Sequence, residues 1–202
     1  MKLFLIRHGE TDANRVLGHG VDGPAHNSPL TFQPGEDTNI PLNPNGRAQA
    51  FLAAQNLPDN ITRILCSPLL RTRETAEIIC EEKGIEKQTI LFRDELIEYH
   101  AGRLEGLSAE QKFAITGGVK EGSGLLCNYD YTKYGGDSWK TIHRRVSALF
   151  DELRTQKGDA CIVCVTSGGV IRMAYKVLFD DRAPNISAHV LVKNGSVHEF
   201  LI

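Results

Sequence analysis

Short runs of consecutive apolar residues alternate along the chain with longer segments whose apolar residues recur at helical spacing. The runs at 3–6, 61–66 and 160–165 have the length and continuity of buried parallel strands. Segments 44–57, 69–79, 138–153 and 170–179 have the period of helices. The pattern predicts a three-layer α/β/α sandwich with a mainly parallel sheet.

Local signals sharpen several boundaries. Asn43, followed by Pro44, is typical of a helix N-cap, and Ser138 is a second N-cap at the start of a periodic helix. The short run 89–92 predicts a further strand. Asn194-Gly195, between two alternating runs, predicts a hairpin that gives the sheet an antiparallel edge strand.

Two stretches lack a clear pattern. Segment 12–43 is rich in Gly, Pro, Asn and His, and it predicts a long loop that forms a wall of the site. Its histidines, His19 and His26, are open to two interpretations, as ligands or as solvated side chains. Segment 99–136 predicts a small cap with one helix at 109–115, so the chain is expected to form a single domain, 1–202, with this insertion. Three tyrosines of the cap either stack on a substrate ring or pack beneath the cap: Tyr129, Tyr131 and Tyr134.

Composition narrows the class of protein. The formal net charge of −2 gives no global field that would hold nucleic acid or an anionic membrane. No apolar run approaches the ~20 residues of a membrane span, which predicts a cytoplasmic protein. Cys161-x-x-Cys164 has the spacing of a metal or redox motif, but within a strand it directs the two thiols to opposite faces. Most of the five cysteines lie within apolar patterns, which suits buried, reduced thiols better than disulfides: Cys66, Cys80, Cys127, Cys161 and Cys164.

Polar residues follow three of the predicted strands at the edge where ligands bind in such sheets. Arg7-His8 ends the first strand, Arg71 lies near the start of the helix after the second, and Ser167-Gly168 follows the last. Guanidinium groups hold phosphate oxygens through paired hydrogen bonds, and a neutral imidazole can attack phosphorus. These residues predict a site for phosphoryl chemistry.

The segment Arg7-His8-Gly9-Glu10-Thr11 resembles the signature of the histidine phosphatase superfamily, the phosphoglycerate-mutase-like proteins. The resemblance extends over almost the whole chain and implies that His8 is phosphorylated during turnover. It further implies that Asn14 contacts phosphate and that Glu98 protonates the leaving oxygen, with Glu95 as the competing acid. Glu10 and Thr11 are expected to support the loop.

Ser167 departs from the family pattern, which has a second catalytic histidine before the glycine. A serine donates one neutral hydrogen bond but supplies no positive charge. Losing one preorganised donor of this kind costs roughly 100–1000-fold in rate. A serine nucleophile of the α/β-hydrolase type is the other interpretation, but that motif needs glycine where this chain has Val165.

The sequence therefore predicts a phosphatase that hydrolyses a small phosphomonoester through a phosphohistidine, with activity reduced by Ser167. The alternatives are a catalytically impaired protein that binds a phosphorylated ligand or has a regulatory role, and a phosphoglycerate mutase. A small phosphorylated substrate is the expected partner, without nucleic acid or membrane. No cofactor and no metal are implied, and the sequence makes no prediction of the oligomeric state.

Overall fold

The computed structural model describes residues 1–17, 39–105, 107, 109–116, 129–155, 159–179 and 190–202. Within these residues one five-stranded sheet has the order β3-β2-β4-β1-β5. Neighbouring strands are parallel except for β5, which runs antiparallel to β1 at the edge. The strands are β1 (Lys2–Arg7), β2 (Arg63–Cys66), β3 (Leu91–Phe92), β4 (Cys161–Thr166) and β5 (Val197–Leu201).

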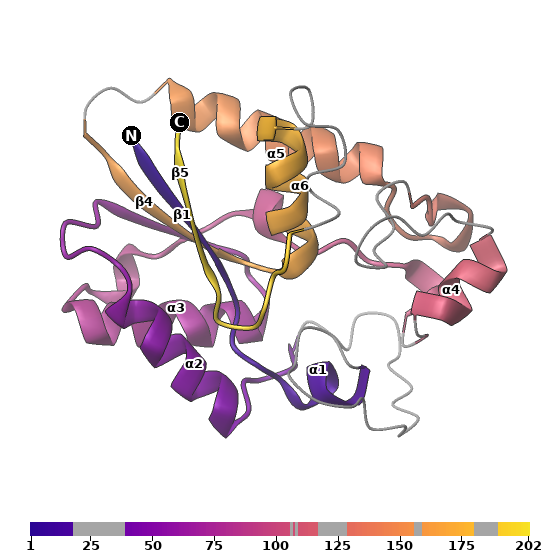
Figure 1. Ribbon diagram of the computed structural model, residues 1–202, viewed down its shortest axis with the longest axis horizontal. Coiled ribbons are helices and arrows are strands. Elements are labelled where there is room, and N and C mark those ends of the chain that lie inside the picture. The colour runs from indigo at the N-terminus through magenta and orange to yellow at the C-terminus, as the bar shows by residue number, and fades with distance from the viewer. Residues whose placement is uncertain (18–38, 106, 108, 117–128, 156–158, 180–189) are drawn as a thin grey trace.

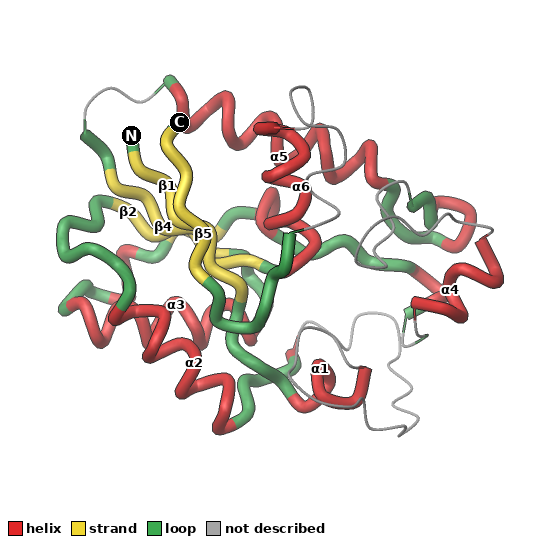
Figure 2. The backbone as a smooth tube through the Cα atoms, viewed as in Figure 1, coloured by secondary structure: helices red, strands yellow, loops and turns green. Residues whose placement is uncertain are grey.

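Helices cover both faces of the sheet (Figure 1). The pair α2 (Pro44–Gln55) and α3 (Leu70–Lys83) lies on one face, and α5 (Trp139–Arg154) and α6 (Gly168–Phe179) lie on the other. Figure 2 shows two further helices away from these layers, α1 (Asp12–Leu17) and α4 (Ala109–Thr116). The short 3-10 turns are η2 (Lys87–Thr89), η3 (Asp94–Leu96), η4 (Gly102–Leu104) and η5 (Thr132–Tyr134). The predicted three-layer sandwich with an antiparallel edge strand is confirmed.

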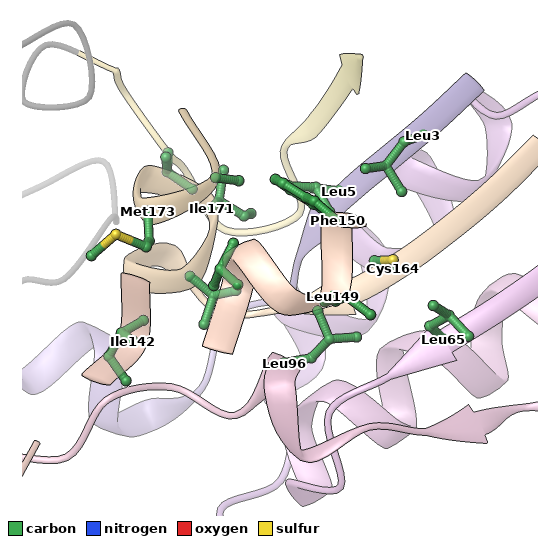
Figure 3. Close-up of a cluster of buried hydrophobic side chains, with 14 of the residues drawn as sticks. Leu3, Leu5, Leu65, Leu96, Ile142, Leu149, Phe150, Cys164, Ile171 and Met173 are labelled. Carbon is green, nitrogen blue, oxygen red and sulfur yellow. The ribbon is translucent and has the colours of Figure 1, made fainter. Parts of the chain in front are cut away.

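The core lies on both faces of β1 and β4. Leu3 and Leu5 pack with α5 and α6, whereas Phe4 and Ile6, one position along, pack with α2 and α3. Figure 3 shows the first cluster, in which Leu149 and Phe150 of α5 meet the sheet. Each such side chain contributes about 1.5–3 kcal/mol on burial. This two-sided packing fixes where β1 and β4 end, and hence where the polar residues after them lie.

The N-cap predictions are confirmed. Asn43 Oδ1 accepts a hydrogen bond from Gly46 N at 2.8 Å, with Pro44 in the first turn of α2. Ser138 Oγ accepts from Thr141 N at 3.3 Å at the start of α5. The side chains predicted for the inner face of α5 are all buried: Ile142, Val146, Leu149, Phe150 and Leu153.

The thiols of the Cys-x-x-Cys motif point to opposite faces, as predicted. Cys161 packs in the cluster under α2 and α3, and Cys164 packs in the cluster under α5 and α6. Both are free, as are Cys66 and Cys80, whereas Cys127 lies outside the described residues. Among the described residues, no group of three or more His, Cys, Asp or Glu side chains is arranged to hold a metal ion.

Three predictions of local structure were wrong. The predicted loop 12–43 is not loop throughout, because α1 forms at its start. Thr11 N and Oγ1 each donate to Asn14 Oδ1 at 3.1 Å, and Asn14 N donates to Thr11 Oγ1 at 3.2 Å. The run 190–193 is not a strand, so the predicted hairpin does not form. Instead, β5 pairs with β1. Only Leu91–Phe92 of the predicted strand 89–92 pairs as a strand, because Thr89 is the last residue of η2.

Other predictions fall outside the described residues, among them most of the loop wall with His19 and His26. The helix predicted inside the cap is present as α4. No helix in the described part of the chain is long and apolar enough to span a membrane.

Candidate active site

His8 lies directly after β1 and is 3% exposed. Its backbone N donates to Thr166 O at 2.9 Å, which extends the β1–β4 pairing one residue beyond the strand. In the ring, Nδ1 is 2.8 Å from Gly9 O. Because a carbonyl only accepts, Nδ1 carries the proton and Nε2 keeps the lone pair. The imidazole is thus fixed in the tautomer that a nucleophile needs.

Two guanidinium groups act on this ring. Burial, followed by the charges of Arg71 and Arg7, lowers the pKa of His8 well below 6.5, and the hydrogen bond to Gly9 opposes this only in part. Arg7 Nη1 donates to Val192 O at 2.8 Å, which fixes its side chain. His8 is therefore neutral at physiological pH, and the two cations beside it form a place for a phosphoryl dianion.

Arg71 reaches the site from the first turn of α3, after the sharp turn that ends β2. Thr75, one turn further on, connects this helix to the segment after β1. Its Oγ1 donates to Arg71 O at 2.8 Å and accepts from Gly9 N at 3.1 Å. The sequence analysis did not identify Thr75, although its place four residues after Arg71 puts it on the same helical face.

Asn14 and Asn194 meet beside His8. Asn194 Nδ2 lies 3.1 Å from both His8 O and Asn14 Oδ1. Asn14 Oδ1 therefore accepts hydrogen bonds from the protein, which leaves the Nδ2 amino group as the part able to donate to an anion. The sequence analysis identified Asn194 only as a turn residue. No local sequence pattern relates it to His8, which lies 186 positions earlier in the chain.

Glu98 is half-buried against the start of α6, within range of the charges of Arg71 and Arg7. Its Oε2 accepts from Gly169 N at 2.9 Å and its Oε1 from Tyr99 N at 3.0 Å. Desolvation raises the pKa of this carboxyl, although the two backbone hydrogen bonds and the charges of Arg71 and Arg7 oppose the rise. Such a group is suited to donating a proton near neutral pH.

Glu95, the competing acid, faces elsewhere. Its carboxylate accepts from Arg93 Nε and Nη2, each at 3.0 Å, and Arg93 also pairs with Glu152. The hydrogen bond from Arg93 lowers the pKa of Glu95, so this carboxylate stays ionised. Glu10 also has a supporting role, because its Oε1 accepts from Asn43 Nδ2 at 2.9 Å.

Ser167 and Gly168 join β4 to α6. Ser167 is 1% exposed, and its Oγ has no hydrogen-bond partner within the described residues. A Cβ built on Gly168 would lie 3.5 Å from Arg7 Nε. The turn after β4 therefore packs directly against the Arg7 guanidinium. A buried hydroxyl without a partner is available to donate to a bound oxyanion.

The cap tyrosines pack on one another beneath this site. The ring centroids of Tyr99 and Tyr129 are 4.4 Å apart, and those of Tyr129 and Tyr131 are 5.2 Å apart. Tyr129 and Tyr131 are buried and Tyr134 is partly buried against the same cluster, so the structure supports the packing interpretation. Tyr99 was not identified from the sequence, although it immediately follows the predicted acid.

The chain matches the family model of the histidine phosphatase superfamily (branch 1) over residues 3–202. It is 34% identical, over 98% of this chain and 86% of the relative, to a Schizosaccharomyces pombe protein named "Probable phosphatase". It is 27% identical to the broad-specificity phosphatase of Saccharomyces cerevisiae over 98% of this chain and 77% of that protein. Each of these proteins shares most of its length with this chain.

Solved structures similar to this chain are also phosphatases. The phosphoserine phosphatase of Entamoeba histolytica, solved with 3-phosphoglyceric acid, has a TM-score of 0.71 and 27% identity, with 99% of this chain and 90% of that chain covered. A mycobacterial glucosyl-3-phosphoglycerate phosphatase has a TM-score of 0.72 and 25% identity, with 98% and 91% covered. The fold and its neighbours define a phosphomonoester hydrolase. The chain belongs to the histidine phosphatase superfamily, branch 1.

Proposed function

We propose that this protein hydrolyses a small phosphomonoester through a phosphohistidine on His8. The observation that carries the proposal is the neutral, oriented imidazole of His8, on which the charges of Arg71 and Arg7 act, as they also do on the Glu98 carboxyl. The three groups supply a nucleophile, a clamp for the phosphoryl oxygens and an acid. Asn14, Ser167 and the Gly168 backbone are proposed as further phosphate contacts.

In the first step His8 Nε2 attacks phosphorus and the bond from phosphorus to the ester oxygen breaks. Arg7 and Arg71 stabilise the charge on the equatorial oxygens. The leaving oxygen takes the proton of Glu98 and departs as an alcohol. In the second step Glu98, now ionised, accepts a proton from water as the water oxygen attacks phosphorus. The bond from His8 to phosphorus breaks, which releases inorganic phosphate and restores both residues.

Ser167 is expected to slow both steps. Its hydroxyl supplies one neutral donor where the resemblance to the family places a second histidine, so no imidazolium charge is available at this point. Phosphate binding is affected less than turnover, because the two arginines remain.

The cap over the site is proposed to be the insertion 99–136. The titles of solved neighbours name phosphoserine, 3-phosphoglyceric acid and glucosyl-3-phosphoglycerate, so small phosphomonoesters that carry a carboxylate are the first substrates to test.

The experiment is hydrolysis of an aryl phosphate and of phosphoserine by the unmodified protein and by His8→Ala. We expect turnover by the unmodified protein and its loss in the variant. Acid-labile phosphate should appear on His8 after rapid quenching. Unchanged turnover in His8→Ala would rule out His8 as the nucleophile. Glu95→Gln, a change outside the site, should leave turnover unchanged.

A second function follows from Ser167. If the missing imidazolium abolishes turnover, the same clamp remains a binding site for a phosphorylated ligand. Two results together would identify this binding role. The unmodified protein would hydrolyse no substrate, and both it and His8→Ala would bind phosphate or vanadate.

A further inference from the structure

Thr166 is the last residue of β4, and it contacts two segments of the candidate site through different atoms. Its backbone O accepts from His8 N at 2.9 Å. Its side-chain Oγ1 donates to Leu96 O at 2.6 Å, across 70 positions of the chain. The residue is fully buried, and the sequence analysis gave it no role. Thr166 therefore joins the segment that carries His8 to the segment that leads to Glu98.

The carbonyl of Leu96 is a fixed point from which Glu98 is placed. Leu96 ends η3, and its side chain is buried in the same cluster as Leu149 of α5 (Figure 3). Ile97 is extended, with φ −67° and ψ 138°, so the chain runs from Leu96 to Glu98 without a turn. A shift of the Leu96 carbonyl therefore moves the backbone of Glu98 with it.

Two further contacts hold the same segment. Arg145 Nη2 of α5 donates to Ile97 O. Gly169 N of α6 donates to Glu98 Oε2 at 2.9 Å. Together with the hydrogen bond from Thr166, these contacts hold three consecutive residues from β4, α5 and α6 in turn. Loss of the Thr166 hydroxyl should therefore displace the carboxyl of Glu98 without releasing it.

We propose that Thr166 is a positioning residue, which sets the place of Glu98 relative to His8 through the hydrogen bond from its hydroxyl to Leu96 O. The inference rests on the proposed function, in which Glu98 protonates the leaving oxygen while His8 attacks phosphorus. Both groups must be in place at once, and a misplacement of about 1 Å can cost about 100-fold in rate. Threonine suits this role because its branched Cβ restricts χ1, which leaves its hydroxyl few positions to occupy.

The test compares Thr166→Val, which removes the hydroxyl and keeps the branched shape, with Thr166→Ser, which keeps the hydroxyl. The quantity measured is kcat/KM for an alkyl and an aryl phosphate, because it reports the steps up to departure of the alcohol. For the alkyl phosphate, kcat/KM should fall about tenfold to a hundredfold in Thr166→Val. For the aryl phosphate, whose leaving oxygen needs little help from an acid, the fall should stay within about threefold. Thr166→Ser should recover most of the loss.

Thr62→Val is the matched control, because it removes a similar hydrogen bond at the opposite end of β4. Thr62 Oγ1 donates to Cys161 O at 2.9 Å, and Cys161 is the first residue of that strand. The change alters no contact of Glu98 or His8, so kcat/KM for both substrates should stay within about twofold of the unmodified protein.

Amide hydrogen exchange measures the displacement without turnover. In Thr166→Val, the Gly169 N–H, which donates to Glu98, should lose protection. The His8 N–H donates to the backbone of Thr166, which the substitution keeps, so its protection should be retained. A general loss of stability would lower both protections together.

Several results would overturn the positioning role. They are unchanged alkyl phosphate hydrolysis in Thr166→Val, equal losses for the two substrates, no recovery in Thr166→Ser, and equal changes in the two amide protections. Should Thr166→Val fail to fold, Thr166→Cys, whose thiol is a weak donor, should show the same difference between the substrates at smaller size.

The outcomes separate the two proposals. Hydrolysis that His8→Ala retains would contradict the phosphatase proposal, whereas a selective loss of Gly169 protection in Thr166→Val would still uphold the placement of Glu98 by Thr166. Hydrolysis that depends on His8 but falls equally for both substrates in Thr166→Val would do the reverse.

Discussion

At the scale of single residues, the structure favours opposite protonation states for two groups of the candidate site. His8 is neutral because burial and two arginines disfavour its cation, and Glu98 tends to hold its proton because burial disfavours its anion. In the mechanism we propose, environment and not residue type makes His8 the nucleophile and Glu98 the acid.

This pairing predicts the pH profile. Turnover of an alkyl phosphate, whose leaving oxygen needs a proton, should fall as pH rises through the raised pKa of Glu98. The limb on the acid side should lie well below pH 6.5, because the pKa of His8 is lowered. In Glu98→Gln, alkyl phosphates should lose far more rate than aryl phosphates. Equal losses for the two substrates would contradict the assignment of the acid.

Ser167→His tests the departure from the family pattern directly. An imidazolium at this position should raise kcat by roughly 100–1000-fold, since it restores one preorganised donor and its charge. Steady-state kinetics with an aryl phosphate measures the change, and Ser67→His, at the end of the neighbouring strand, is the matched control. No gain in Ser167→His would mean that this turn does not contact the transition state.

At the scale of elements, the start of α6 holds the acid. Gly169 N donates to Glu98, and a Cβ on Gly169 would lie 2.3 Å from Glu98 Oε1 and 2.8 Å from the Tyr99 ring. The start of α6, Glu98 and Tyr99 therefore pack together only because residue 169 is a glycine.

Gly169→Ala should separate stability from activity. Alanine is favoured over glycine within helices by about 1 kcal/mol, yet the new methyl group must displace the carboxyl of Glu98. We expect kcat for alkyl phosphates to fall about tenfold or more, as for a displaced general acid. Gly168→Ala, whose Cβ meets nothing closer than 3.4 Å, should have a smaller effect. Equal kinetics in the two variants would contradict this account.

The two N-caps offer a second comparison. Asn43→Ala and Ser138→Ala should each lower the free energy of unfolding by about 1 kcal/mol in urea titrations. Asn43 also donates to Glu10 in the segment after His8, whereas Ser138 has no such contact. KM should therefore rise in Asn43→Ala alone, and an equal KM in both variants would show that Glu10 does not support the site.

At the scale of the whole molecule, the sheet is the common support of residues far apart in sequence. β4 lies between β2 and β1, and its six residues are all buried. β4, which ends just before Ser167, therefore holds both β1, which ends just before His8, and β2, which leads into the helix that carries Arg71.

Ile162→Ala should test this support. Removing a fully buried isoleucine between two strands should cost about 2–5 kcal/mol in the free energy of unfolding. Leu201→Ala, at a side chain that is 79% exposed on the edge strand, should change it by less than about 0.5 kcal/mol. Similar losses in the two variants would mean that β4 is not the centre of the core.

The sequence predicts those features that depend on local pattern. The strand that ends at Arg7 and the cap at Asn43 follow from apolar runs and helix chemistry. The contact of Asn194 with His8 joins residues at the two ends of the chain, and no local signal reports it. Helix α1 was not predicted because its six residues lie in a polar segment without the apolar periodicity of a helix. Hydrogen bonds between Thr11 and Asn14 stabilise its first turn instead.

The turn at Gly195 determines when the candidate site can form during synthesis. Gly195 N donates to the carbonyls of Arg7 and His8, so residues at the end of β1 are fixed by a turn that is synthesised much later. A chain still growing on the ribosome lacks these two hydrogen bonds until the segment around Gly195 has emerged. The candidate site around His8 is therefore completed only after that point, and phosphatase activity should not precede it.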